Sequence, residues 1–409
     1  QGARGMTQTY LVDHVSVAPR YQRSVRIDAD FGQADPLSGY VLQGSARDAL
    51  TTTLRLAKNG QGAFTWTGPY GGGKSSLALA LASYSLGRGP AFKEAKQLLG
   101  DVPEVTAVFG RAPKDWLCVP LSGRRGDPVA DLREALASAI AGEPGHARTK
   151  RSKMEAAGGR DIVERLQREV EARPQGGVLV IVDELGKYLE GAADHAIDIH
   201  FFQDLAEAAN RSEGRLIVVG VLHQAFERYA DRLGQSVQDE WRKIQGRFAD
   251  VPIITAVDEV IELVGRAVTA GRSHPESHAI ADTVASEIAE RRPGVPKDLA
   301  ERLDDCWPLS PAAAALLGPI TRRRFSQNER SLFGFLASAE PNGFAEFLQR
   351  TTLASGRTFG PAELWDYLQV NLEPAIMASP DGHRWAQAAE AIARAGRDGN
   401  DLRLQIAKT

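Results

Sequence analysis

One glycine-rich stretch constrains the fold of this chain more than any other feature. Residues 68–75 have the pattern Gly-x-x-x-x-Gly-Lys-Ser of a phosphate-binding loop. They follow a short β-prone run, 63–67, and precede a helix-forming run that begins at Leu77. Glycines let the backbone N–H groups surround a phosphate, and the positive end of the helix dipole lies at the same place. The order of strand, loop and helix therefore predicts a nucleoside-triphosphate site, with a chance match in a glycine-rich turn as the alternative.

The loop supplies most of the predicted ligand-binding residues. Lys74 is expected to neutralise the β- and γ-phosphates, and the hydroxyl of Ser75 is expected to be a ligand of Mg²⁺. ATP and Mg²⁺ are thus the expected cofactors. The loop residues predicted to bind the nucleotide are Gly68, Pro69, Tyr70, Gly71, Gly72, Gly73, Lys74, Ser75 and Ser76.

A pair of acids at the end of an apolar run is the second motif. Residues 178–182 are apolar and mostly β-branched, as is typical of a central strand that is covered on both faces, and Asp183 and Glu184 follow. We expect Asp183 to hold the Mg²⁺ shell and Glu184 to polarise the attacking water. Two acids can end a strand by chance. Downstream of a complete phosphate-binding loop, however, they predict hydrolysis.

Composition excludes several other classes of protein. The net charge of −3 carries no overall signature of nucleic-acid binding, so any DNA contact would be a local patch. The two cysteines, Cys118 and Cys306, are not spaced as metal ligands, which argues against a zinc site and a disulfide framework and suits a reducing cytosol. No run of about eighteen apolar residues is present, so no membrane-spanning helix is expected.

The two ends of the chain suggest a piece of a longer protein. Residues 1–5, before Met6, look like a cloning remnant rather than a targeting signal. The helical pattern of 401–409 ends without a glycine, a proline or a polar tail. We expect native sequence from Met6 and a C-terminal part beyond residue 409.

The order of the motifs resembles that of the AAA+ ATPases. After the phosphate-binding loop come an apolar strand at 115–122, the acid pair, a strand that ends in His223 and Gln224, Arg247-Phe248 before a last short strand, and a helical region. This order is most similar to the branch that contains the origin-recognition and signal-transducing (STAND-type) ATPases, and it covers about residues 40–340. Segments 68–75, 183–188 and 327–333 also resemble the large ATP-binding proteins of bacterial anti-phage defence islands, such as those of the BREX type.

The resemblance implies an α/β fold with three parts. Residues 1–44 would be an N-terminal extension. Residues 45–257 would form a P-loop NTPase core with a central, mostly parallel sheet of the additional-strand type. Residues 258–409 would form an α-helical lid followed by a helical or winged-helix-like region. The phosphate-binding loop and the acid pair are farther apart than in compact AAA+ modules, so we expect an insertion at about 87–160.

The same resemblance implies a sensor and an arginine finger. A polar sensor is expected between the acid pair and the γ-phosphate, and Gln224 or His223 would supply it unless these residues simply cap the strand. Arg247, or otherwise Arg242, stands where an arginine finger would act across a subunit interface. The alternative is an ordinary surface arginine.

Two further residues are candidate nucleotide contacts. Tyr40 belongs to the segment that often packs on the adenine in P-loop ATPases, although ordinary core packing explains it equally well. Arg330, near the start of a helix in the lid region, would be a second sensor that reaches back to the nucleotide.

Local basic segments are the only support for DNA as a partner. These are the loop 142–159 and the cluster Arg322–Arg324, and a solvated surface explains both equally simply. The sequence thus leaves three functions open: a DNA-associated ATPase in a defence complex, a STAND-like assembly switch, or an ATP-binding scaffold. The expected partners are ATP, DNA, and further copies or defence-complex proteins, without a membrane. Glu184 favours hydrolysis over the scaffold.

Overall fold

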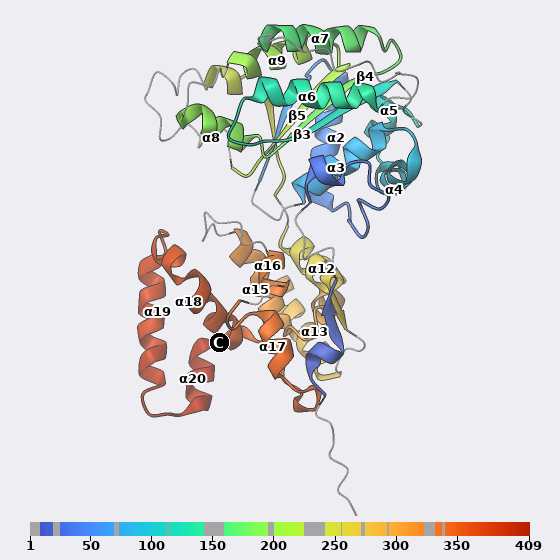
Figure 1. Ribbon diagram of the computed structural model, residues 1–409. Helices are drawn as coiled ribbons and strands as arrows, with labels where there is room; N and C mark the ends of the chain where they lie inside the picture. Colours follow the sequence, from blue (N-terminus) through green and yellow to red (C-terminus); the bar gives the residue numbers. More distant parts are fainter. Residues whose placement is uncertain are drawn as a thin grey trace, which may run out of the picture. The chain divides into compact units, whose positions relative to one another are not determined.

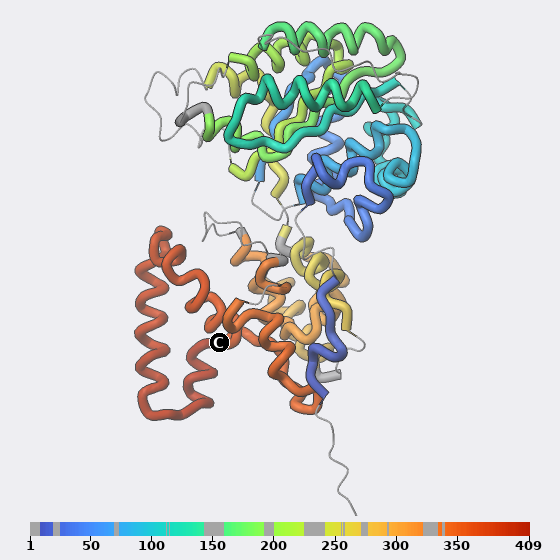
Figure 2. The backbone as a smooth tube through the Cα atoms, in the orientation of Figure 1, coloured from blue at the N-terminus to red at the C-terminus, as the bar shows by residue number. Residues whose placement is uncertain are grey.

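The chain folds as two units. In the computed structural model, one unit comprises Val25–Ile254, and the other comprises Gln1–Ser24 together with Thr255–Thr409 (Figure 2). The segment 1–44, expected as one extension, is therefore divided between the units, whereas the boundary after Ile254 lies close to the expected one. The structure describes residues 9–18, 25–68, 73–111, 113, 115–142, 159–194, 200–224, 242–254, 256–270, 275–292, 294–322, 332–337 and 340–409.

A sheet of five parallel strands forms the centre of Val25–Ile254. Its order is β3 (Trp116–Ser122), β4 (Gly177–Asp183), β5 (Leu216–Leu222), β2 (Ala63–Thr67) and β6 (Ala249–Pro252), and every neighbouring pair is parallel. β5 lies between the strand that precedes the phosphate-binding loop and the strand that precedes the acid pair. The predicted α/β class, with a parallel central sheet that contains an additional strand, is confirmed.

Helices cover both faces of this sheet (Figure 1). One face packs against α2 (Gly44–Lys58), α3 (Lys74–Ser85), α4 (Gly89–Leu99) and α5 (Pro103–Phe109), and the other against α6 (Pro128–Ala141), α7 (Gly159–Glu171) and α9 (His200–Asn210). Strand β4 shows why its sequence is continuously apolar. Val180 and Val182 enter the core on one face, whereas Leu179 and Ile181 enter the core on the other. Both faces are buried, so neither accepts polar residues.

The region expected as an insertion is largely part of the core. α4, α5, β3 and α6 all lie between residues 87 and 142, and β3 is a full strand of the sheet. Leu99 and Val105 are buried in one core, and Leu132 and Leu136 in the other. The wide separation of the two motifs therefore comes from helices and a strand of the core. The expectation of an insertion at about 87–160 is wrong for residues 89–141, which belong to these elements. Residues 143–158, which carry most of the basic loop, lie outside the described residues.

The second unit is mainly helical. Its small sheet pairs β1 (Val15–Val17) with β7 (Val268–Ala270) in antiparallel fashion, next to the one-turn helix η1 (Leu11–Asp13). Within the region expected to be helical from residue 258, Val268–Ala270 are a strand, because they pair with β1. The remaining helices are α12 (Val257–Ala267), α13 (Pro275–Arg291), α14 (Leu299–Asp304), α15 (Pro311–Arg322), α16 (Leu332–Ala337), α17 (Phe344–Arg350), η3 (Leu353–Ser355), α18 (Pro361–Met377), α19 (Gly382–Ala395) and α20 (Asp401–Lys408).

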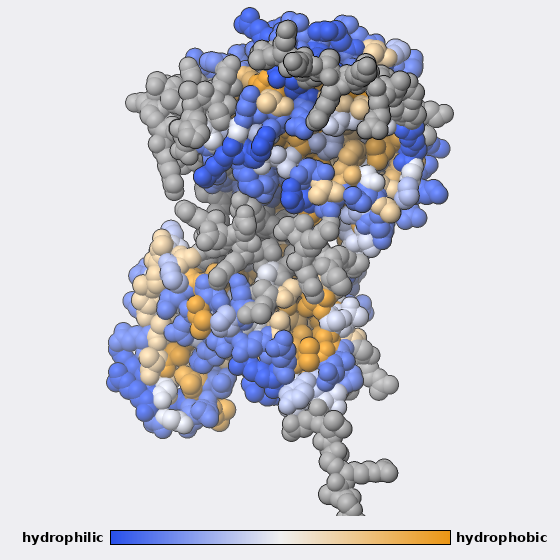
Figure 3. Space-filling model, viewed as in Figure 1, coloured by the Kyte–Doolittle hydropathy of each residue, from blue (hydrophilic) through white to orange (hydrophobic). Residues whose placement is uncertain are grey.

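The described part of the C-terminal region is helical. A wing is a β-hairpin, and the described residues after β7 contain no named strand, only the isolated bridges of Leu309 with Phe359 and of Thr352 with Tyr10. Over the face seen in Figure 3, hydrophilic residues predominate and the visible apolar residues form small patches. Among the helices that the structure describes, none combines the length and the apolar character needed to cross a bilayer.

Candidate functional site

Three neighbouring strands bring the sequence motifs to one edge of the sheet. The phosphate-binding loop follows β2, the acid pair ends β4, and His223 and Gln224 follow β5. Because β2, β5 and β4 are adjacent and parallel, their carboxyl ends lie side by side. Ligands of open α/β sheets bind at this edge.

The ends of the phosphate-binding loop show why it needs glycine. Gly73 has a φ of 72°, in the left-handed region, and α3 begins at the next residue. A Cβ at Gly68 would lie 2.2 Å from the carbonyl oxygen of Ile253, so a side chain would collide with the neighbouring backbone. Pro69, Tyr70, Gly71 and Gly72 lie outside the described residues.

Lys74 places a buried positive charge at the start of α3. It is only 3 % exposed, and its ammonium donates a hydrogen bond to the carbonyl oxygen of Gly68 at 2.8 Å. Burial lowers the pKa of Lys74 to about 8, while the negative charge of Asp183 acts in the opposite direction. A desolvated ammonium at a helix N-terminus favours an anionic ligand, which would restore the electrostatic stabilisation that water no longer provides.

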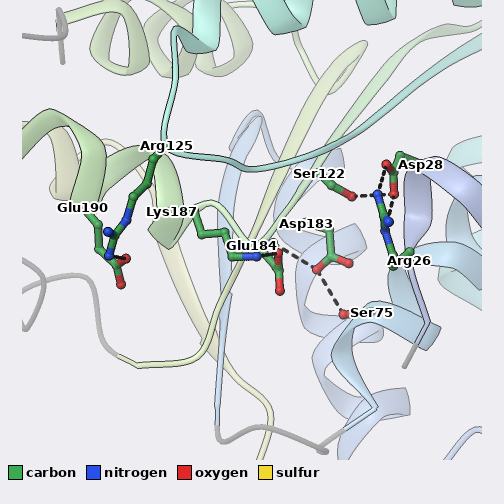
Figure 4. A network of polar contacts seen from close by, with 9 residues as sticks. All are labelled: Arg26, Asp28, Ser75, Ser122, Arg125, Asp183, Glu184, Lys187 and Glu190. Atoms are coloured by element: carbon green, nitrogen blue, oxygen red, sulfur yellow. Dashed lines mark hydrogen bonds and ion pairs between the residues drawn. The ribbon is translucent and has the colours of Figure 1, made fainter. Parts of the chain in front are cut away.

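Ser75 and Asp183, the two predicted metal ligands, are in direct contact (Figure 4). The Ser75 hydroxyl donates to Oδ1 of Asp183 at 3.0 Å, and the backbone N–H of Glu184 donates to the same oxygen at 3.0 Å. Burial raises the pKa of Asp183 to about 6, and the hydrogen bond from Ser75 opposes the shift. A hydroxyl and a carboxylate are hard oxygen ligands. They fit Mg²⁺, which usually takes few protein ligands and completes its shell with phosphate and water.

Glu184 has an unusual backbone that its neighbours hold in place. Its φ is 53°, in the left-handed region, which is uncommon for a residue with a side chain. On one side the N–H of Gly123 donates to the carbonyl oxygen of Asp183 at 2.6 Å, and on the other the N–H of Leu185 donates to that of Val221 at 3.0 Å. The end of β4 is therefore anchored to the loop after β3 and to β5.

The anchoring predicts a specific effect of a small substitution at Gly123. A Cβ at Gly123 would lie 2.2 Å from the carbonyl oxygen of Glu184, so Gly123→Ala should displace the acid pair. We expect the free energy of unfolding to fall by about 1–3 kcal/mol in urea denaturation, as is usual for overpacking. Gly126→Ala is the matched control, because its Cβ would approach only the Arg124 side chain, at 3.6 Å. Equal stability of the two variants would contradict the close approach at Gly123.

His223 lies at the end of β5, the strand between β2 and β4. Burial lowers the pKa of His223 to about 3, and the positive charges of Lys74 and Lys187 lower it further. The imidazole is therefore neutral and close enough to Lys74 to experience its charge. Gln224, the other sensor candidate, is partly buried one residue further on.

Tyr40 lies near the phosphate-binding loop and also packs on the core. Its Cε2 atom would lie 3.8 Å from a Cβ at Gly73, and its ring contacts the core cluster that contains Trp66. The two interpretations of Tyr40, a nucleotide contact and a core residue, are thus compatible.

Arg247 is not brought to the site of its own chain. It precedes β6, whose Ala249 pairs with Phe64 near the start of β2, so it lies at the amino edge of the sheet. The five residues of β2 separate the two edges by about 16 Å. The guanidinium pairs with the Glu207 carboxylate, with an Nε–Oε1 distance of 2.6 Å. Arg242 is exposed on the preceding turn, whereas Arg330 lies outside the described residues.

Several polar residues at the same edge were not identified from the sequence (Figure 4). Lys187 forms an ion pair with Glu184, and Arg125 with Glu190. Ser122, opposite Asp183 in the ladder, donates to Asp28 at 3.0 Å, and Asp28 pairs with Arg26 at 2.7 Å. The spacing of three residues between Glu184 and Lys187 was a usable local signal, although Glu184 itself lies before α8. The contact of Ser122 with Asp28, a residue of the short helix α1 (Ile27–Asp30), is long-range and has no such local signal.

Comparisons with known proteins leave the family open. No protein-family model and no curated protein matches the chain. Among solved structures, the chain is similar to the ORC2 protein of Aeropyrum pernix, solved as ADPNP–ADP complexes. The sequence identity is 16 % and the TM-score 0.37, over 66 % of this chain and 68 % of that chain. A similarity of this size does not support a functional argument, so function has to be inferred from the geometry of the site.

Proposed function

We propose that the chain binds ATP with Mg²⁺ at the carboxyl ends of β2, β5 and β4 and hydrolyses the β–γ bond, as an AAA+-type ATPase. The observation that carries this proposal is the hydrogen bond between Ser75 and Asp183 beside the buried ammonium of Lys74. An ammonium, a hydroxyl and a carboxylate converge at the N-terminus of α3. A magnesium-bound triphosphate requires these groups in this arrangement.

In this proposal, several residues of the unit Val25–Ile254 share the binding of ATP and Mg²⁺. Lys74 neutralises the β- and γ-phosphates, and the N–H groups of the loop 68–76 surround them. Ser75 and Asp183 would hold Mg²⁺, which supplies Lewis-acid stabilisation of the phosphate charge when bound. Tyr40 would lie against the nucleotide from the segment before α2.

The chemical step depends on the groups that follow β4 and β5. Glu184 accepts a hydrogen bond from the attacking water and orients it toward the γ-phosphorus. His223 is our first choice for the polar sensor, since the charge of Lys74 acts on it, and Gln224 is the second. A neutral imidazole can donate one hydrogen bond and accept another, which suits a group between a water and a phosphate oxygen.

Hydrolysis is tested by the steady-state release of phosphate from ATP by the wild-type chain. We expect turnover that requires Mg²⁺ and stops when EDTA removes the metal. A chain that binds ATP tightly but releases no phosphate, at any protein concentration and with or without DNA, would contradict hydrolysis and support the scaffold function.

Arg247 is proposed to act on ATP bound by a neighbouring copy. We expect Arg247→Ala to slow turnover about a hundredfold at protein concentrations that support assembly, because a cation near the transferring phosphoryl group is lost. Turnover of dilute monomer should be unchanged, since Arg247 lies at the far edge of its own sheet.

Arg211→Ala is the control for this variant. Arg211 also pairs with Glu207, at 3.8 Å, and its side chain is well exposed. Its removal tests whether the loss of an ion pair on Glu207 is enough to slow the enzyme. Equal rates for both variants under assembly conditions would remove the finger assignment.

The biological setting is proposed from the resemblance of three segments to defence-island ATPases. We infer that the ATPase cycle works on or near DNA in anti-phage defence, with a STAND-like switch as the alternative. ATP turnover should be measured with and without double-stranded DNA, together with the molecular mass in ATP. Strong stimulation by DNA supports the first function, and ATP-dependent assembly without stimulation supports the second.

A further inference from the structure

We propose that Lys187 is a second phosphate-binding cation of the site, supplied by the same chain, and that it exchanges Glu184 for the γ-phosphate when ATP binds. The inference rests on the proposed ATP site and adds to it a residue that distinguishes ATP from ADP.

The position of Lys187 follows from the end of β4. α8 (Gly186–Asp194) begins directly after the acid pair, and Lys187 is its second residue. The N–H of Lys187 donates to the carbonyl oxygen of Glu184 at 3.0 Å, and its ammonium forms an ion pair with the Glu184 carboxylate. Figure 4 shows this pair next to Asp183 and the contact with Ser75. Lys187 therefore stands beside the proposed water-activating and metal-binding groups.

Lys187 lies at the same edge of the sheet as the lysine of the phosphate-binding loop. It pairs with Glu184, whose N–H donates to the Asp183 oxygen that also accepts from Ser75, the residue after Lys74. The positive charges of Lys74 and Lys187 both act on the imidazole of His223, which lies at the end of the strand between β2 and β4. The two ammoniums thus lie at the carboxyl edge of the sheet, one after β2 and one after β4, with β5 between these strands. A γ-phosphate bound by Lys74 would bring negative charge to the edge of the sheet where the ammonium of Lys187 lies.

The ion pair between Lys187 and Glu184 is open to solvent, so the ammonium can leave the carboxylate for another anion. The side chain of Lys187 is 45 % exposed and that of Glu184 is 30 % exposed, so neither is locked by burial. Pairs of this kind contribute little stability, because water competes for both charges. A terminal phosphate carries more charge than a carboxylate and offers several oxygens, so it is the stronger partner for the ammonium.

The exchange has a consequence for catalysis. While Lys187 pairs with Glu184, one carboxylate oxygen is engaged by the ammonium. When the ammonium moves to the γ-phosphate, Glu184 is released and can accept a hydrogen bond from water. At the same time Lys187 adds positive charge at the transferring phosphoryl group. The presence of the γ-phosphate is thereby coupled to the availability of the base.

The first test compares two nucleotides on the full chain. The affinities of ADP and of the non-hydrolysable analogue AMP-PNP are measured by titration calorimetry for wild type, Lys187→Met and Lys187→Arg. We expect Lys187→Met to weaken AMP-PNP about tenfold, as for the loss of a hydrogen bond between charged groups, with ADP affinity unchanged. Lys187→Arg should restore the preference. An unchanged ratio of the two affinities in Lys187→Met would overturn the proposal, and ADP binding shows that the variant is folded.

The second test addresses the exchange itself. Glu184→Gln removes the competing negative charge, so it should strengthen AMP-PNP binding severalfold while Lys187 is present. The double variant Glu184→Gln/Lys187→Met should not show this gain. The same gain in the double variant would exclude the exchange. Failure of the wild type to bind either nucleotide would instead contradict the ATP site, so the two claims fail separately.

Discussion

Glu184→Gln is expected to lower the rate of ATP hydrolysis about a thousandfold without loss of ATP affinity. The amide keeps the size of the side chain but cannot accept a proton from water, and a positioned general base typically contributes a factor of this order. Glu184 is the partly exposed acid of the pair, whereas Asp183 is buried against Ser75. Only Glu184 therefore remains available to a water molecule. The measurement is single-turnover phosphate release together with an equilibrium binding assay.

Glu190→Gln is the matched control for this variant. Glu190 lies on α8 and, like Glu184, is an acid with a cationic partner, here Arg125 at 3.2 Å. Its side chain is more exposed than that of Glu184. We expect Glu190→Gln to hydrolyse ATP at nearly the wild-type rate. Wild-type turnover in Glu184→Gln would show that another group activates the water.

Lys74→Ala is expected to weaken ATP binding at least a hundredfold. The ammonium is 3 % exposed and bonded to the Gly68 carbonyl, so it is already positioned for a phosphate at the start of α3. Removal of one partner from a buried, charged contact has effects of this size. The measurement is direct titration with ATP and Mg²⁺.

A surface lysine provides the control for Lys74→Ala. Lys93 is exposed on α4, and Lys93→Ala should bind ATP like the wild type. A melting curve of the nucleotide-free protein checks that Lys74→Ala is folded. Since burial of an ammonium is unfavourable, this variant should be at least as stable as the wild type without ATP. Tight ATP binding by a folded Lys74→Ala chain would invalidate the phosphate-binding assignment.

The central sheet could be predicted because its strands are buried on both faces. Runs such as Val178–Val182 admit almost no polar residue, and each is followed by polar groups at the edge where ligands bind. The phosphate-binding loop and the acid pair were recognisable for a different reason: their chemistry demands particular residues at fixed spacing. Ser75 follows β2 and Asp183 ends β4, so their contact is consistent with the parallel order of β4, β5 and β2, whose carboxyl ends lie at one edge.

The remaining parts of the site depend on long-range geometry. A shift of a single residue at the end of β5 exchanges the positions of His223 and Gln224. Sequence spacing alone therefore does not determine which of them is the sensor. The helix α8, with Lys187, was not identified from the sequence, since it is only nine residues long. For Arg247 the sequence predicted only a candidate finger, and its place at the amino edge, far from the loop of its own chain, follows from the pairing of Ala249 with Phe64.

Two errors in the organisation have a similar origin. Residues 268–270 were expected to continue a helix, but they pair with β1, a strand more than 250 positions earlier in the sequence. The presumed insertion contains β3, which was predicted as an apolar strand at 115–122 but not as the partner of β4, with which it pairs along its whole length. In both cases a pairing between distant segments decided the structure, and local pattern does not show which segments pair.

The most direct test of the ATP site is a titration of the wild-type chain with a fluorescent ATP analogue, with Mg²⁺ and with EDTA. We predict saturable binding that is strengthened by Mg²⁺, displaced by unlabelled ATP, and lost in Lys74→Ala. Absence of saturable binding by the folded wild-type chain would contradict the proposed function.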